Sequence, residues 1–258
     1  MTEGGPPGDP GETGVSLDAF LGGRIQLRQL RSGYRAGLDA VLLAAAAPVM
    51  RAGTALDAGS GAGAASLCYM ARAAGPRLTL LELEPRLAEL AAENVAHNGF
   101  AGRASVVTAD IRQPVAGMPP GGFDLVLTNP PWLESRRADP PADALRRLAH
   151  VETAVPLPLW LDRCLRLLKP RGRLALAHRA DRLDTALAAL AGRAGDITII
   201  PLWPRAGQPA NRIILLARKG AKGPCRLSAG LILHEADGRH TPAAEAILRG
   251  GGALDAAA

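Results

Sequence analysis

Short apolar runs alternate with helical patterns along most of the chain, and this alternation predicts the fold class. The runs with strand character cover residues 54–57, 77–82, 104–107, 123–128, 172–178, 197–203 and 212–218. The helical patterns, rich in Ala and Leu, cover 38–50, a stretch from about residue 64, 87–98, 157–168 and 182–190. Strands that alternate with helices favour a mainly parallel sheet with right-handed crossovers. We therefore predict an α/β fold with helices on both faces and an antiparallel final strand, because a Pro/Gly loop joins the last two runs.

Length and composition bound the domain organisation. With 258 residues and 48% hydrophobic content, the chain is long enough to bury one full core. Residues 1–14 contain Gly, Pro, Thr and three acids but no Lys or Arg, which is typical of a disordered tail. We expect the rest, 15–258, to be a single domain. Its parts are a hairpin-like N-terminal extension, a core and a C-terminal extension, at 15–37, 38–220 and 221–258.

The N-terminal extension contains a basic alternating segment. Gly22 and Gly23 divide two short stretches, and from Arg24 to Arg31 basic or polar residues alternate with apolar ones. This period of two indicates a half-buried strand, so a hairpin with a basic outer face fits the pattern. An edge strand that uses its charges to prevent pairing with another chain fits it equally well.

A polar residue, two prolines and an aromatic residue follow the apolar run at 123–128. Asn129, Pro130, Pro131 and Trp132 thereby lie at one edge of the predicted sheet. The prolines fix the backbone and leave carbonyls free to accept hydrogen bonds. The Asn129 side-chain oxygen and the Pro130 carbonyl could accept both N–H bonds of a planar NH2 group, and Trp132 could stack on its face. The alternative is an ordinary turn at the end of a strand.

A glycine-rich turn follows the first core strand. Asp57 precedes Gly59, Gly61 and Gly63, and a helical pattern comes next. Glycines let the backbone approach a ligand closely, and the start of a helix offers free N–H groups. The spacing also fits a dinucleotide fingerprint, but a carboxylate before the first glycine suits an amine-bearing ligand better than a pyrophosphate. Glu82 ends the next strand about twenty residues later, where a doubly wound sheet places an acid on a ribose diol. A solvated strand end is the alternative for Glu82.

Taken in order, these motifs resemble those of class I S-adenosylmethionine-dependent methyltransferases over residues 35–220. The resemblance implies a Rossmann-like methyltransferase fold and S-adenosylmethionine as the cofactor. It places the glycine motif at the methionine moiety and Glu82, with Leu83, at the ribose. An acid–hydrophobe pair would lie at the adenine ring: Asp110 and Ile111. The motif that begins at Asn129 is similar to one in enzymes that methylate amino nitrogens on planar groups, so Asn129 is expected beside both cofactor and acceptor.

The flanking segments resemble bacterial tRNA1(Val) adenine-37 N6-methyltransferases. Arg35, after an aromatic residue, and Asp39, at a helix start, would lie beside the cofactor. Leu38 stands where many members have Thr, which removes a possible hydrogen bond to the cofactor. The tail matches as well, at 212–216, 231–242 and 246–250. The resemblance implies N6-methylation of adenine 37 of a valine tRNA. The alternatives are methylation of a guanine amine in rRNA, methylation of a release-factor glutamine, and a non-catalytic cofactor-binding module.

The net charge of +6 bears on the partner. Because residues 1–14 hold three of the 24 acids, the remainder carries 30 − 21 = +9, which favours a polyanionic substrate such as nucleic acid. Only three bases are lysine, so 30 − 3 = 27 are arginine, and nucleotide-composition bias in the genome is a competing explanation. The candidates for contact with RNA phosphates are Arg24, Arg28, Arg31, Arg136 and Arg137.

The remaining composition limits other classes of function. Cys68, Cys164 and Cys225 have no metal-ligand spacing, and the five histidines are dispersed, so we expect no metal and reduced thiols in the cytoplasm. No uncharged apolar run reaches transmembrane length, and the Gly/Pro-rich acidic start does not resemble a signal peptide, so we expect no membrane partner. Trp160 lies at helical spacing with neighbouring leucines, which favours core packing for it. The sequence leaves the oligomeric state open.

Overall fold

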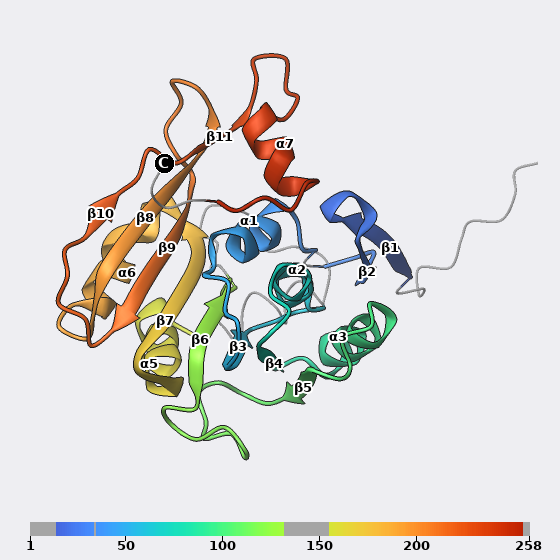
Figure 1. The fold of residues 1–258 in the computed structure, drawn as a ribbon, viewed down its shortest axis with the longest axis vertical. Coiled ribbons are helices and arrows are strands. Elements are labelled where there is room, and N and C mark those ends of the chain that lie inside the picture. Colours follow the sequence, from blue (N-terminus) through green and yellow to red (C-terminus); the bar gives the residue numbers. More distant parts are fainter. Residues whose placement is uncertain (1–13, 34, 132–154, 255–258) are drawn as a thin grey trace, which may run out of the picture.

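The computed structural model describes residues 14–33, 35–131 and 155–254. A nine-stranded sheet forms its centre, in the order β10-β8-β9-β7-β6-β3-β4-β5, with β11 also paired to β8 (Figure 1). The bounds of these strands are β3 Thr54–Ala58, β4 Arg77–Glu82, β5 Ala104–Thr108, β6 Phe123–Thr128, β7 Leu168–Arg179, β8 Ala194–Arg205, β9 Arg212–Lys219, β10 Arg226–Leu227 and β11 Leu231–His234.

The direction of the strands agrees with the sequence pattern. Neighbouring strands from β5 to β7 run parallel. β9 lies between β7 and β8 and runs antiparallel to both. The prediction of a mainly parallel sheet with an antiparallel final strand is therefore confirmed. β10 and β11 pair with β8 in parallel and widen the sheet beyond the strands that the apolar runs indicated.

Helices cover both faces of the sheet, as predicted (Figure 1). One face carries α1 Leu38–Ala46, α2 Ala64–Arg72 and α3 Pro85–His97. The other carries α5 Leu157–Leu167 and α6 Leu183–Leu190, the latter preceded by a short 3-10 turn at Ala180–Arg182. Alternate residues of each strand enter the two cores: in β3, Ala55 packs with the first group of helices and Leu56 with the second. This follows from the period of two in a strand, and it explains why consecutive positions in these runs are apolar.

Helix α1 is shorter than the sequence pattern suggested. The Ala/Leu-rich run extends to Met50, but the helix ends at Ala46. Ala47 has extended backbone angles, φ −63° and ψ 137°, and it precedes Pro48. A proline disfavours helical geometry in the residue before it and has no N–H to continue the helix, so the expected extension to Met50 was wrong.

An antiparallel hairpin precedes the core. β1 (Val15–Phe20) pairs with β2 (Ile25–Leu30) across a 3-10 turn at Leu21–Gly23. Asn94 of α3 and Asn98, the C-cap residue of that helix, hold the outer edge of β2. The Asn94 side chain accepts from Arg28 N at 2.8 Å and donates to Arg28 O at 3.0 Å. Asn98 does the same with the N–H and carbonyl of Gln26, at 2.9 and 2.8 Å. Side-chain amides one helical turn apart thereby replace a neighbouring strand and attach the hairpin to the domain.

The C-terminal residues return to the first helix. β11 pairs with β8, and α7 (Pro242–Leu248) starts with Thr241 as its N-cap, which accepts from Ala244 N. Apolar residues of both elements belong to the same core as α1, namely Leu231, Leu233, Ala244 and Ile247. Leu254 N donates to Ala45 O at 3.0 Å. Leu254 therefore lies beside α1, and Figure 1 shows α7 next to the same helix.

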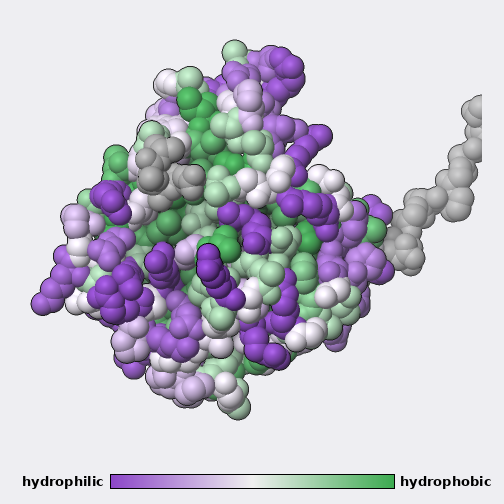
Figure 2. Space-filling view, viewed as in Figure 1, coloured by the Kyte–Doolittle hydropathy of each residue, from purple (hydrophilic) through white to green (hydrophobic). Residues whose placement is uncertain are grey.

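Within the described residues, no helix combines the length and apolar character needed to cross a bilayer. Figure 2 shows hydrophilic side chains spread across the whole visible face, with hydrophobic ones between them.

Candidate active site

The glycine turn forms one side of a pocket at the carboxyl ends of the strands. Gly59, Gly61 and Gly63 have φ values of +72°, +55° and +90°, a region that side chains rarely adopt. Gly59 N and Ser60 N both donate to Leu81 O, at 2.9 and 3.0 Å, which fixes the turn against β4. A Cβ on Gly61 would meet no atom within 4 Å, so this residue faces open space. The turn thus presents bare backbone to a ligand.

Asp57 supplies a buried carboxylate beneath this turn. It lines the pocket, is 1% exposed, and accepts a hydrogen bond from Ser66 Oγ at 2.6 Å. Burial raises its pKa to about 6, while the bond from Ser66 acts in the opposite direction. A cationic group placed beside Asp57 would restore its charged form. Ser66, in the first turn of α2, is a supporting residue that the motif did not indicate.

Glu82 is held in place by three backbone donors. Its Oε2 accepts from Gly61 N at 2.7 Å, and its Oε1 accepts from Leu83 N and Glu84 N at 2.9 and 3.0 Å. A carboxylate has about four acceptor positions, so roughly one stays available for a further donor. The side chain therefore joins the glycine turn to the end of β4 and is oriented before any ligand arrives.

The acid–hydrophobe pair lies at the end of the next strand. Ala109 N donates to Glu82 O at 2.9 Å, which brings this segment beside β4. Asp110 forms a salt bridge with Arg112 at 2.7 Å, and this partner lowers the pKa of Asp110. Ile111 is buried in the core that contains Leu81. Neither Asp110 nor Ile111 lines the pocket itself, whose walls come from β2, β3, α1, α2, α3 and the end of β6.

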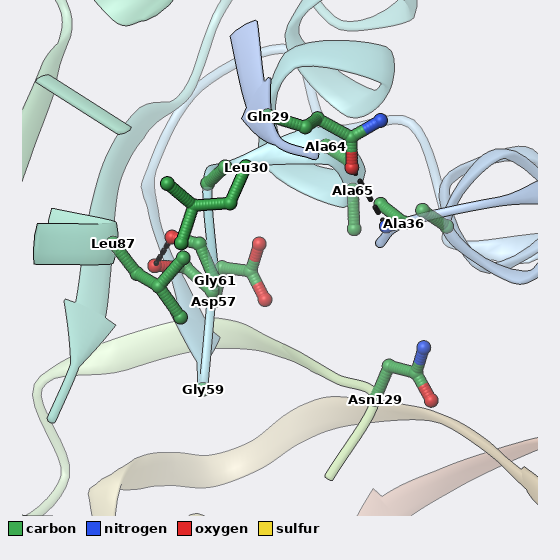
Figure 3. Close-up of a pocket in the computed structure, with 13 residues that line it drawn as sticks. Gln29, Leu30, Ala36, Asp57, Gly59, Gly61, Ala64, Ala65, Leu87 and Asn129 are labelled. Carbon is green, nitrogen blue, oxygen red and sulfur yellow. Dashed lines mark hydrogen bonds between the residues drawn. The ribbon is translucent and has the colours of Figure 1, made fainter. Parts of the chain in front are cut away.

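Asn129 faces the glycine turn across this pocket. It follows β6, whose last residue, Thr128, pairs in register with Ala58 of β3. Figure 3 shows the Asn129 side chain on one side, with Asp57 and Gly61 opposite. Pro130 is buried directly after it. The structure therefore brings together Asp57, the glycines and Asn129, whereas Trp132 lies outside the described residues.

The hairpin and the stretch between it and α1 form a further wall of the pocket, which the motifs did not indicate. Gln29, Leu30 and Ala36 line the pocket. Gln29 is 3% exposed, its Oε1 accepts from Ala36 N at 2.7 Å, and its Nε2 donates to Asp18 at 2.9 Å. The only sequence signal for Gln29 was its inward position in the alternating segment. Its bonds hold the stretch before α1 against the pocket.

Arg35 and Asp39 are next to this wall but bind other residues. The Arg35 guanidinium lies 2.5 Å from Asp18 and also donates to Leu30 O at 2.9 Å. Asp39 lies 2.9 Å from Arg212 of β9. Burial raises the pKa of Asp39, and Arg212 opposes this. Neither side chain lines the pocket, so in this arrangement each supports the segment around α1 rather than the pocket surface.

The candidate RNA contacts divide into three groups. Arg24 is turned back, donating to Leu21 O and Gly250 O at 3.2 and 2.9 Å. Arg28 and Arg31 are exposed on and just after β2. Within the ranges that the structure covers, neither takes part in a salt bridge. Arg136 and Arg137 lie outside the described residues.

The pocket has the features that S-adenosylmethionine requires. A buried carboxylate suits the amine of its methionine moiety, and bare glycine backbone permits close approach. Glu82 does not line the pocket, but it is bonded to Gly61, which does, and its oriented carboxylate suits hydroxyl donors. Within the described part of the chain, no group of three His, Cys, Asp or Glu side chains is arranged to hold a metal ion.

Comparison with known proteins agrees with this chemistry. Residues 36–149 match the family model of the methyltransferase small domain. A predicted O-methyltransferase, Atu636 of Agrobacterium tumefaciens, superposes with a TM-score of 0.68 at 27% identity, covering 84% of this chain and 98% of that one. TYW2 of M. jannaschii, crystallised with AdoMet, shares the fold at a TM-score of 0.54 and 13% identity, over 81% of this chain and 87% of that one. The protein is an S-adenosylmethionine-dependent methyltransferase.

Two relatives define the family more closely. A tRNA1(Val) (adenine(37)-N6)-methyltransferase of Porphyromonas gingivalis is 34% identical over 175 residues, 66% of this chain and 68% of the relative. Another, of Aeromonas hydrophila, is 31% identical over 213 residues, 82% of this chain and 87% of the relative. The chain belongs to the family of tRNA1(Val) (adenine(37)-N6)-methyltransferases.

Proposed function

We propose that this protein methylates the N6 amine of adenine 37 in a valine tRNA. The names of its relatives support this acceptor. The observation that carries the proposal is the position of Asn129, which lines the same pocket as Asp57 and the glycine turn. An amide that can accept from an NH2 group therefore lies next to the groups suited to the methyl donor.

The cofactor contacts follow from the residues around the pocket. Asp57 would bind the amine of the methionine moiety and Glu82 a ribose hydroxyl, with Leu83 beside it. Asp110 and Ile111, at the end of the adjacent strand, would border the adenine ring. Arg35 and Asp39 stay predictions as direct contacts, since each would have to exchange its present partner, Asp18 or Arg212, for the cofactor.

The acceptor amine is a poor nucleophile because its lone pair is delocalised into the purine ring. When bound, S-adenosylmethionine supplies a methyl group activated by the positive charge on sulfur. The Asn129 side-chain oxygen and the Pro130 carbonyl would accept the two N–H bonds and orient the lone pair for in-line transfer. The extra proton leaves afterwards, so no dedicated base is needed. Trp132 would stack on the base, contributing about 1–3 kcal/mol.

The hairpin is the proposed guide for the RNA backbone. Gln29 and Leu30 of β2 line the pocket, so the exposed Arg28 and Arg31 are within a few residues of its wall. Adenine 37 adjoins the anticodon and must turn outward to enter a pocket, which phosphate contacts on either side would assist. Arg136 and Arg137 are proposed as further contacts on the sequence evidence alone.

The acceptor can be tested with fractionated cell material. Purified protein and radiolabelled cofactor are incubated with tRNA, rRNA and protein fractions, and the labelled product is identified by nucleoside mass spectrometry. We expect N6-methyladenosine at position 37 of a valine tRNA, formed far more slowly by the Asn129→Ala variant. Label in rRNA as a methylated guanine amine, or only in protein glutamine, would overturn the acceptor assignment.

The role of the hairpin is tested by salt. Each phosphate contact adds about −0.7 to −0.9 to the slope of log affinity against log salt. The double variant Arg28→Ala/Arg31→Ala should flatten this slope in filter-binding measurements and should weaken the binding of all tRNAs to the same extent. Arg77→Ala, an exposed arginine at the opposite end of β4, is the matched control. Equal slopes for both variants would remove the hairpin from the RNA interface.

A further inference from the structure

A chain of two side-chain hydrogen bonds joins the ends of β3 and β6, from which the two loops that line the pocket start. Thr128 Oγ1 donates to Ala58 O at 2.8 Å, and Trp160 Nε1 donates to Thr128 Oγ1 at 2.8 Å. An indole N–H can only donate and a carbonyl can only accept, so the direction of both bonds is fixed by chemistry. We call this connection the Trp160–Thr128 relay.

The relay lies where the backbone ladder stops. The last paired residues of β3 and β6 are Ala58 and Thr128. Gly59 leaves the sheet after the first, and Asn129 leaves it after the second. Both of these residues line the pocket. The ladder therefore does not extend to the two loops, and the relay is placed to set their separation.

The indole ring also contacts the glycine turn directly. A Cβ on Gly59 would lie 3.0 Å from Trp160 Cζ2 and Cη2, so the ring edge occupies the space that a side chain there would need. Trp160 is 6% exposed and Thr128 is fully buried. Trp160 thus supports the cofactor side by ring contact and the acceptor side by its N–H.

We propose that Trp160 and Thr128 are positioning residues that fix the distance between the bound methyl donor and the acceptor amine. This rests on the function proposed above, in which Asn129 holds the amine. Neither residue touches the reacting atoms, and neither titrates. Methyl transfer needs the reacting atoms aligned at about 3–3.5 Å, and a displacement of about 1 Å can lower a rate by 100-fold. Loss of the relay should therefore lower the rate of transfer more than the binding of either substrate.

The test compares two substitutions of Thr128. Thr128→Val keeps the shape but removes the hydroxyl, whereas Thr128→Ser keeps the hydroxyl. Single-turnover methylation is measured with saturating cofactor and RNA, together with cofactor affinity by calorimetry and the melting temperature. We expect Thr128→Val to lose about 10- to 100-fold in rate, with cofactor affinity within about 3-fold, and Thr128→Ser to stay near wild type. Thr198→Val, a buried threonine of β8 far along the sheet, is the matched control and should keep its rate.

A second measurement reads the bond without catalysis. In a ¹H–¹⁵N correlation NMR spectrum, which shows the three indole N–H groups, the Trp160 indole hydrogen should exchange slowly with solvent. Thr128→Val should make this exchange faster. Fast exchange in the wild type would overturn the relay even if a variant failed to fold. Equal methylation rates for the Thr128→Val and Thr128→Ser variants would overturn the positioning role of the relay. A loss of rate that a higher RNA concentration restores would overturn it as well. If the wild type methylates another acceptor, the proposed function fails, and the Val-to-Ser rate ratio on that acceptor still decides the relay.

Discussion

The two walls of the pocket are held together by different kinds of interaction. On the sheet side, Asp57, the glycine turn and Asn129 sit at strand ends whose positions are set by the parallel backbone ladder, and Glu82 supports the turn from the end of β4. On the hairpin side, the wall depends on side chains, above all Asn94 and Gln29. Strand ends keep their positions when a single side chain changes, whereas a wall joined by a few amides depends on each of them. Substitutions should therefore affect chemistry and cofactor contacts on the first side, and the placement of a whole segment on the second.

The largest effect is expected at Asn129. If its amide oxygen orients the acceptor amine, Asn129→Ala should lower single-turnover rate by ~100-fold or more while cofactor affinity stays near normal. Asn129→Asp keeps acceptor oxygens at the same place and should retain more activity than Ala. Near wild-type turnover in the Asn129→Ala variant would show that Asn129 is an ordinary turn residue. The two walls would then no longer differ in function as described above.

Glu82 comes next. Glu82→Ala removes a charged acceptor from the proposed ribose site, worth about 1.5–3 kcal/mol for one bond, so cofactor affinity should fall by roughly 10- to 100-fold. Glu84→Ala is the control, because the side chain of this exposed neighbour caps α3 by accepting from Arg86 N. Calorimetry on folded variants is the measurement. Equal affinities for the two variants would exclude Glu82 from the cofactor site.

Asp57 makes cofactor binding depend on pH. Its folded pKa of about 6 lies above the ordinary 3.8. As pH rises from 3.8 to about 6, the carboxyl ionises in the unfolded chain but stays protonated in the cofactor-free fold, so the free energy of unfolding decreases over this range. A bound ammonium favours the ionised carboxylate, so affinity should rise by roughly tenfold between pH 5 and 7 and then level off. Asp57→Asn should abolish this rise in calorimetric titrations. A rise that survives the substitution would assign it to another group.

The smallest effect on the chemistry is expected from Asn94 in the hairpin wall. It is fully buried and bonds both Arg28 and Ala62 O, which links the hairpin to the glycine turn. Asn94→Ala leaves buried backbone groups unpaired and should lower stability by about 1–3 kcal/mol, or roughly 2–10 °C in melting temperature. Hydrogen exchange should speed up in β2 while the β3 ladder is unchanged. Asn98→Ala, at the less buried position, should show the same pattern more weakly. Equal acceleration in β3 would mean that the two walls are one unit.

The same contrast explains what the sequence could predict. Strand ends are local features, because an apolar run followed by a polar residue or a glycine marks them. The positions of Asp57, Glu82 and Asn129 at strand ends could therefore be predicted from the sequence. The bonds of Asn94 and of Trp160 link residues that are far apart in the chain. Gln29, Asn94, Thr128 and Trp160 also look like ordinary strand, helix or core positions in the sequence. Trp160 was correctly expected in the core, but nothing local indicated its bond to Thr128. The early end of α1 shows the converse, because Pro48 was a local signal that the Ala/Leu run obscured.

The contact between Leu254 and Ala45 has a consequence for how the chain folds during synthesis. α1 and the residues that complete its core, Leu231, Leu233, Ile247 and Leu254, are separated by about 200 positions. At roughly 5–20 residues per second, a ribosome needs on the order of 10–40 s to make that stretch. Throughout this time one apolar side of α1 lacks its native cover. A nascent chain stalled before residue 231 should therefore bind chaperones that the released protein does not.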